Sequence, residues 1–197
     1  MKGYKGTDVN MCCLGFQYEL GETYKLKGLM RIGTNGFHFC EKLIAIDDCY
    51  DLFTSRVFEV EAKGEIKSDR IKYCTNEIEF VRELSKEEVI ELANKSVNDK
   101  NAYIRMTLAK SKLALPETLE ILSEDESLFV RECVASNSKT STKLLGILSQ
   151  DEERLVRCGV ASNLSTTDIL LKKMCQDKHL IVRNVAKNTL EMKETNL

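Results

Sequence analysis

Apolar and polar positions mostly alternate along the first part of the chain. Residues 16–20 (FQYEL) alternate, and Arg56–Ala62 and residues 71–81 carry β-branched and aromatic side chains at strand spacing. Because successive side chains of a strand point to opposite faces, this pattern predicts strands. Residues 41–53 instead place apolar side chains three or four apart, which predicts one helix. This part is therefore expected to be an α+β domain, mostly an antiparallel sheet with one helix.

The pattern changes near Ser85. Ser85 followed by Glu88 three residues later has the form of a capping box, so a helix is expected to begin there. Eight of the ten glycines and eleven of the thirteen aromatic residues precede this point. The sequence therefore predicts two domains, an α+β domain over residues 1–84 and a helical domain over residues 85–197.

The second domain repeats itself every 26 residues. An apolar residue followed by arginine recurs at this spacing, and leucine, alanine and aspartate positions keep the same register. The four dipeptides are Ile104-Arg105, Val130-Arg131, Val156-Arg157 and Val182-Arg183. A fixed period with matching apolar positions predicts stacked units, each with a longer and a shorter helix, which form a short helical solenoid.

Several residues predict where these helices begin and end. Asp125 and Asp151 are placed to accept backbone N–H groups before the longer helices. Asn137 is placed to end a helix through a left-handed residue, and Pro116 to occupy a first helical position. The last unit lacks one residue and ends in a polar tail, which is typical of a terminal capping repeat.

The pattern Val-Arg-x-x-Val-Ala-x-Asn, followed by Leu-x-x-Leu-x-x-Asp, resembles the leucine-rich variant repeat, a relative of HEAT-like repeats. The resemblance covers about residues 99–190. It implies α-helices alternating with short 3₁₀-like helices in a right-handed superhelix. Some members of that family hold an iron–sulfur cluster with closely spaced cysteines, a set that this chain lacks.

The front half resembles an uncharacterised domain of bacteriophage and prophage proteins. The resemblance is carried by residues 15–19 (GFQYE), 21–24 (GETY), 36–40 (GFHFC) and 58–62 (FEVEA). It suggests an origin in a mobile element and implies no activity.

Charge and cysteine usage narrow the classes of function. Residues 1–81 carry 11 basic and 13 acidic side chains, and the remainder carries 18 of each, so neither domain has the positive excess typical of nucleic-acid binding. No apolar run has the length of a signal peptide or a membrane span, so a cytosolic location is expected. The eight cysteines are irregularly spaced, which favours free thiols over a zinc site, even with His38 and Cys40 close together. No cofactor is expected.

Two sets of residues are candidates for binding. Arg105, Arg131, Arg157 and Arg183 form either a basic ridge for an acidic partner or, as we favour, structural contacts with neighbouring repeats. His38, between Phe37 and Phe39, is expected to face away from the core, where it is a surface residue, a base or a metal ligand.

The order of elements in the front half is also loosely similar to small ADP-ribosyltransferase folds. Their catalytic Glu-x-Glu is matched by Glu59 and Glu61 or by Glu77 and Glu79, but alternating strands produce this pattern on an exposed face by default. The first strand has no arginine, and the Ser-Thr-Ser motif is absent. The sequence thus predicts a non-enzymatic protein-binding protein, for example an inhibitor or modulator of a host defence protein. An NAD-using transferase and a nucleic-acid-binding accessory protein remain alternatives.

Overall fold

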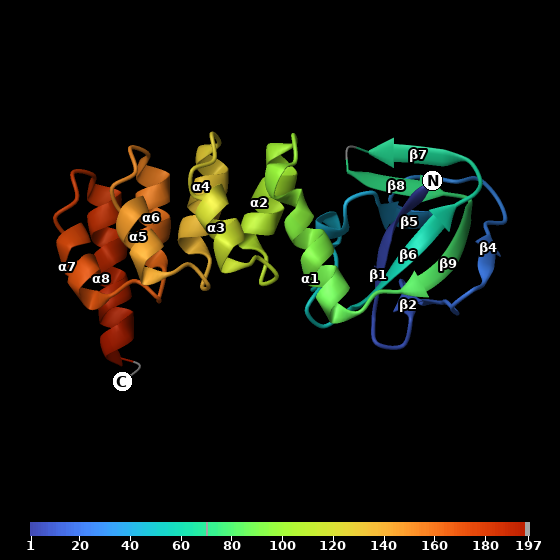
Figure 1. Cartoon of the computed structure of the whole chain (residues 1–197), viewed down its shortest axis with the longest axis horizontal. Coiled ribbons are helices and arrows are strands. Elements are labelled where there is room, and N and C mark those ends of the chain that lie inside the picture. The colour runs from blue at the N-terminus through green and yellow to red at the C-terminus, as the bar shows by residue number, and fades with distance from the viewer. Residues whose placement is uncertain (70, 196–197) are drawn as a thin grey trace. The chain divides into compact units, whose positions relative to one another are not determined.

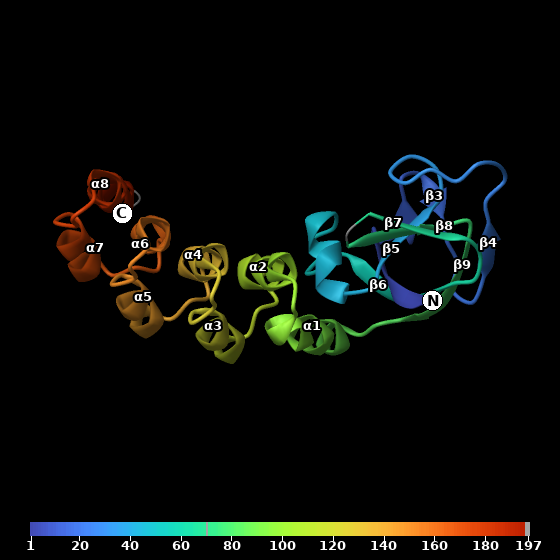
Figure 2. The same ribbon diagram turned by 90° about the horizontal axis from the view of Figure 1, so that it is seen from above.

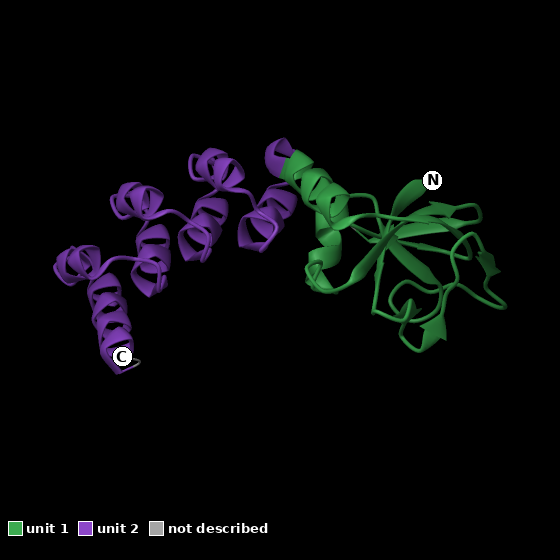
Figure 3. Ribbon diagram, turned by 60° about the horizontal axis from the view of Figure 1, so that its bottom comes forward, with its two compact units in different colours: residues 1–96 green, residues 97–197 purple. Residues whose placement is uncertain are grey.

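The computed structural model describes residues 1–69 and 71–195. The chain divides into two compact units, Met1–Ser96 and Val97–Leu197 (Figure 3). The helix α1 (Lys86–Asn94) begins at Ser85 with both hydrogen bonds of the expected capping box. It belongs to the first unit, because it contacts the 3₁₀ helix η1 (Leu43–Asp48) and buries Val89 and Ala93. The division therefore follows this helix, whereas the sequence pattern places the boundary before it.

The first unit is built on an antiparallel sheet of seven strands in the order β4-β9-β6-β1-β5-β8-β7 (Figure 1). Its strands are β1 (Lys2–Thr7), β4 (Thr23–Lys25), β5 (Phe37–Cys40), β6 (Arg56–Ala62), β7 (Ile66–Asp69), β8 (Lys72–Thr75) and β9 (Glu77–Glu83). A separate pair is formed by β2 (Cys12–Cys13) and β3 (Phe16–Gln17). The α+β architecture expected from the alternating pattern is confirmed.

One buried cluster of this unit is formed by side chains on one face of the sheet. Phe58, Ile78 and Phe80 are fully buried, and the ring of Tyr18 stacks on Phe80 with centroids 4.4 Å apart. These side chains come from the central strands β6 and β9 and from the loop after β3. The apolar positions of the alternating segments thus supply this cluster.

Two expectations for this unit were wrong in detail. The segment predicted as a helix over residues 41–53 forms only η1, and Phe53 is exposed. Leu43, Ile44, Ala45 and Ile46 are all buried in succession, which a helix with one apolar face does not allow. The strand expected over residues 16–20 is limited to Phe16–Gln17.

The second unit consists of helices whose first residues keep the 26-residue period. The longer helices are α2 (Ala102–Lys110), α4 (Leu128–Ser136), α6 (Arg154–Ser162) and α8 (Leu180–Thr195), and the shorter ones are α3 (Pro116–Leu122), α5 (Thr142–Leu148) and α7 (Asp168–Met174). A 3₁₀ turn, η2 (Lys95–Asn98), precedes them. The longer helices form one row and the shorter helices a second row beside it (Figure 2). The run of helices expected after the sheet is therefore present.

The ends of these helices differ from the expectation in two ways. Asn137 has an extended backbone (φ −72°, ψ 128°) rather than a left-handed one. Its side-chain amide instead donates to the carbonyl groups of Ala109 and Ser111, so it closes the end of the helix in the preceding repeat. The shorter helices are seven-residue α-helices and not 3₁₀ helices.

The last helix, α8, is longer than its counterparts, because the polar segment expected as a tail continues it to Thr195. Lys193 in this segment contacts the carbonyl of Thr166 and the carboxylate of Asp168. Within the described residues, no helix combines the length and the apolar character needed to cross a bilayer.

Candidate functional sites

The repeated arginines lie between successive repeats. In the first three repeats, the arginine Nε and Nη2 donate to both oxygens of an aspartate 20 residues later, with Nε–Oδ2 distances of 2.6, 2.8 and 2.8 Å. The Nη1 donates to the backbone carbonyl of the aspartate at the start of the arginine's own repeat, at 2.7 to 2.9 Å. The pairs are Arg105–Asp125, Arg131–Asp151 and Arg157–Asp177.

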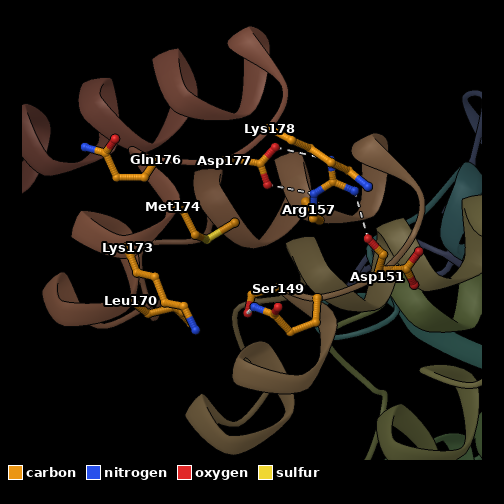
Figure 4. A pocket seen from close by; sticks show the side chains of 10 residues that line it. Ser149, Asp151, Arg157, Leu170, Lys173, Met174, Gln176, Asp177 and Lys178 are labelled. Carbon is orange, nitrogen blue, oxygen red and sulfur yellow. Dashed lines mark hydrogen bonds and ion pairs between the residues drawn. The ribbon is translucent and has the colours of Figure 1, made fainter.

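Figure 4 shows this arrangement at Arg157, whose guanidinium lies between Asp177 and Asp151. The adjoining pocket has a volume of about 360 Å³, but its arginine is already bound to Asp177. Bidentate arginine–carboxylate pairs are among the stronger hydrogen-bonded contacts in proteins. These three arginines therefore connect repeats and do not present a free guanidinium to a ligand.

Electrostatics in each pair favour the charged forms. Burial alone would raise the pKa of Asp177, but hydrogen bonds from Arg157 and from the His179 N–H outweigh it and hold that pKa below its ordinary value. The hydrogen bond to Asp177 raises the pKa of Arg157. The carboxylate is thus both a charge partner for the preceding repeat and an acceptor for the turn before α8.

Arg183 in the last helix has a different environment. Its Nη1 donates to the carbonyl of Asp177 at 2.8 Å, as in the other repeats. Among the described residues, no carboxylate forms an ion pair with it. Arg183 therefore makes the contact within its own repeat and not the one to a following repeat.

A line of exposed apolar side chains crosses the row of longer helices. Each belongs to the second residue of its helix and directly precedes the buried apolar residue that comes before the repeated arginine. The apolar line consists of Tyr103, Phe129, Leu155 and Ile181, exposed by 42%, 56%, 43% and 51%. Because α2 contacts α4, α4 contacts α6 and α6 contacts α8, these positions follow one another across the unit.

Acidic side chains gather at the start of the two middle helices of this row. A shallow groove at the start of α4 and α6 is lined by Glu124, Glu126 and Glu152, together with Asp125, Asp151 and Arg131. Both aspartates are paired with arginines, and Glu126 contacts Arg105 at 3.3 Å, but all three glutamates are exposed. The charge that this groove presents to solvent is therefore negative.

A second candidate site is a cavity in the first unit with a volume of about 310 Å³. Its walls come from β1, β2, β5, η1, β8 and the loops that contain Gly33 and Tyr50. Lys5 is its most buried charged group, with only 4% of the residue exposed. The Lys5 Nζ donates to the His38 carbonyl at 2.8 Å and to the Cys13 sulfur at 3.5 Å. The Tyr50 hydroxyl also donates to this sulfur, at 2.8 Å.

Burial lowers the pKa of Lys5, although the nearby Cys13 opposes this shift. Burial also raises the pKa of Tyr50, and the hydrogen bond to Cys13 acts in the same direction. Lysine is rarely buried unless it is paired, and a buried lysine in a cleft is a feature of functional sites. Lys5, Cys13 and Tyr50 are therefore the chemically distinctive group of this unit.

His38 lies on the wall of the same cavity, while Phe37 and Phe39 are buried in the core. Its Nε2 accepts a hydrogen bond from the Gly33 N–H at 2.8 Å. Burial, followed by the positive charges of Lys5 and Lys72, lowers the pKa of His38. The imidazole is thus held by the loop before β5, and Nε2 is not directed at a ligand.

Three of the four carboxylates that matched a transferase motif are engaged in ion pairs on the sheet. Glu59 binds Arg82 at 2.8 Å, and Glu77 and Glu79 contact Lys25 and Lys63. The cysteines of the described chain are free thiols, and within residues 1–69 and 71–195 no group of three His, Cys, Asp or Glu side chains is arranged to hold a metal.

Removal of the Lys5 charge is expected to stabilise the first unit. Lys5→Met keeps an apolar stem of similar size and eliminates a buried charge, so we expect a gain of about 1–3 kcal/mol at pH 7. The desolvation cost that is removed is larger than the contribution of the hydrogen bond lost at the His38 carbonyl, which is about 1 kcal/mol. Denaturant unfolding monitored by circular dichroism measures the difference, with the exposed Lys67→Met as control.

The gain should depend on pH. Because burial lowers the pKa of Lys5, the unfolded chain binds more protons than the folded chain above that lowered pKa. Wild-type stability therefore rises with pH towards the ordinary lysine pKa of 10.5, and the advantage of Lys5→Met shrinks over the same window. A Lys5→Met variant less stable than wild type at pH 7 would contradict this account.

Comparison with known proteins bears on the first unit alone. No curated protein and no solved structure matches the chain. Residues 1–92 match one family, whose description gives no activity. The predicted resemblance of the front half to an uncharacterised domain is confirmed to that extent, while its phage origin and the repeat family stay predictions. A domain of unknown function, DUF7666, covers residues 1–92 of this chain.

Proposed function

We propose that the chain is a protein-binding protein whose helical unit presents the apolar line to a partner. The observation that carries this proposal is the recurrence of an exposed Tyr, Phe, Leu or Ile at the same position of four successive helices. Contiguous exposed apolar side chains mark interaction surfaces, whereas single ones are common and need no explanation. Aromatic residues are also enriched among the residues that dominate binding energy.

We take the helical unit to be a right-handed solenoid of 26-residue repeats, similar to the leucine-rich variant repeat. In a solenoid each repeat contacts only its neighbours, so a position that is exposed in one repeat is exposed in all and forms a continuous strip. Specificity then resides in the residues that vary along the strip.

The groove glutamates indicate the chemistry of the partner. Glu124, Glu126 and Glu152 precede α4 and α6, the helices that carry Phe129 and Leu155, so a basic partner would gain there and a nucleic acid would be repelled. The partner we propose is a protein segment with apolar side chains on one face and lysine or arginine beside them. A modulator of a host protein, one role expected from the sequence as a whole, would bind in this way.

The test compares two double variants of the full chain. Phe129→Ser with Leu155→Ser removes the middle of the apolar line, and Ile121→Ser with Ile147→Ser removes apolar side chains that are 53% and 60% exposed on the other row of helices. The probe is a synthetic amphipathic peptide of leucine and lysine, and its leucine–glutamate counterpart is the control. Calorimetry should show at least tenfold weaker binding of the basic peptide to the first variant only, the loss expected for a side chain contributing more than about 1.4 kcal/mol.

A cell lysate then identifies the natural partner. Proteins retained by wild type and by the Ile121/Ile147 variant, but lost with the Phe129/Leu155 variant, are partners of the apolar line. Equal binding of the basic peptide by both variants, or preference for the acidic peptide, would rule out this surface.

A further inference from the structure

The cavity of the first unit has an unbalanced charge. Among the described residues that line it, the charged side chains are Lys5 and Lys72, and no carboxylate is present. The remaining walls are largely apolar or aromatic, with Phe39, Ile46 and Tyr50 among them. A cavity of this size is at the lower end of the range for small-molecule sites, which are mostly apolar with a few convergent polar groups.

Lys72 has a partner at the edge of this cavity. Its Nζ donates to the Cys49 sulfur at 3.0 Å, and this contact raises the pKa of Lys72. Lys5 lies deeper, and among the described residues no carboxylate forms an ion pair with it. Its two hydrogen-bond acceptors are a backbone carbonyl and the Cys13 sulfur. A buried ammonium has a high desolvation cost unless a negative charge is brought to it.

We propose that this cavity binds a small organic anion, with its acidic group at Lys5 and its apolar body against Phe39, Ile46 and Tyr50. The anion supplies the negative charge that the protein itself does not place beside Lys5. Lys72 adds a second positive charge near the mouth, which attracts an acidic ligand. This site is in the first unit and is independent of the apolar line, so either can fail without the other.

Cys13 provides a reporter inside the site, because its sulfur is 3.5 Å from the Lys5 Nζ. The test uses two alkylating probes that differ in charge, iodoacetate and neutral iodoacetamide. In each reaction the thiolate sulfur displaces iodide from carbon, so an S–C bond forms as the C–I bond breaks, and the thiol proton passes to solvent. The ratio of the two rates at one cysteine therefore measures the local attraction for an anion.

Cys12 is the matched control in the same molecule. It is also partly exposed, but its sulfur contacts Gln17 Oε1, and it does not line the cavity. Mass spectrometry of partially alkylated protein gives the rates at both positions. We expect the iodoacetate-to-iodoacetamide ratio to be at least about tenfold higher at Cys13 than at Cys12.

Lys5→Met should bring the ratio at Cys13 down to that at Cys12, whereas Lys67→Met, which lies outside the cavity, should leave it unchanged. Equal ratios at Cys12 and Cys13 in the wild-type protein would overturn the proposal without any variant. A high ratio at Cys13 that persists in folded Lys5→Met protein would overturn it as well, because the anion would then not depend on Lys5.

Discussion

Arg157→Ala is expected to destabilise the helical unit by about 3–5 kcal/mol, the cost of leaving one partner of a buried ion pair without its counter-charge. Arg157 has the least exposed of the three paired arginine side chains, at 4%. Its removal leaves the Asp177 carboxylate, whose side chain is only 10% exposed, without its counter-charge, and it removes the donor to the carbonyl groups of Asp151 and Glu152. Thermal and urea unfolding of the full chain, followed by far-ultraviolet circular dichroism, give the loss.

Two further variants separate the contributions of charge and geometry. Lysine keeps the positive charge but cannot donate from a planar fork to both oxygens of Asp177 and to the carbonyls together, so Arg157→Lys should recover only part of the stability. Arg157→Met combined with Asp177→Leu removes both charges and should cost less than Arg157→Ala alone. Arg154→Ala is the matched control on the same helix, since Arg154 is exposed and its side chain forms a hydrogen bond with the His179 ring.

Melting of Arg157→Ala at the wild-type temperature would show that the pair contributes nothing. The arginines would then become the first place to look for a ligand, as the basic ridge interpretation requires. The same experiment on Arg131→Ala should give a similar loss, because Arg131 makes the corresponding contacts to Asp151 and Asp125.

The helical unit could be predicted from the sequence because the same pattern of apolar and polar positions recurs every 26 residues. Position 130 needs an apolar residue for the same reason as position 156, so the helix starts follow directly from the spacing. The arginine contacts were one of two open interpretations, because a sequence shows that an arginine recurs but not which carboxylate it reaches. The partner aspartate recurs with the same period, 20 residues later, and this was the available signal.

The apolar line was missed for a different reason. Phe129 precedes the buried Val130, and both are apolar, so a hydrophobic pattern does not distinguish the exposed residue from the buried one. The helix places successive side chains about 100° apart, and only the structure shows which of the two faces the neighbouring repeat. The register of Tyr103, Phe129, Leu155 and Ile181 was nevertheless present in the 26-residue spacing.

The cavity around Lys5 could not be predicted from a motif. Lys5, Cys13, His38, Tyr50 and Lys72 come from distant segments that the sheet brings together. Each residue is ordinary in its local sequence, and Lys5 becomes unusual only because it is buried. Pairing of β1 with both β5 and β6 places it at the centre of the sheet, and the order of strands is not encoded in any short pattern.

Leu145→Ala should cost about 2–5 kcal/mol, the range for truncating a buried leucine and leaving a cavity behind. Leu145 lies on α5 in the middle of the helical unit and is fully buried, as are its counterparts Leu119 and Leu171 within 1%. Truncation should cost most at the middle position, because a repeat that is packed between two neighbours cannot easily rearrange to fill the cavity. The loss should appear as a lower urea midpoint with an unchanged slope, since the substitution hardly changes the amount of surface that unfolding exposes.

Ile147→Ala is the matched control on the same helix. Ile147 is two residues away but 60% exposed, so its truncation should change stability by no more than about 0.5 kcal/mol. A comparison of the two variants therefore tests the register of the repeat and not merely the tolerance of α5 to alanine. If Leu145→Ala and Ile147→Ala shifted the midpoint equally, the assignment of Leu145 to the interior of the repeat would be wrong, and the 26-residue alignment of the leucines would have to be shifted with it.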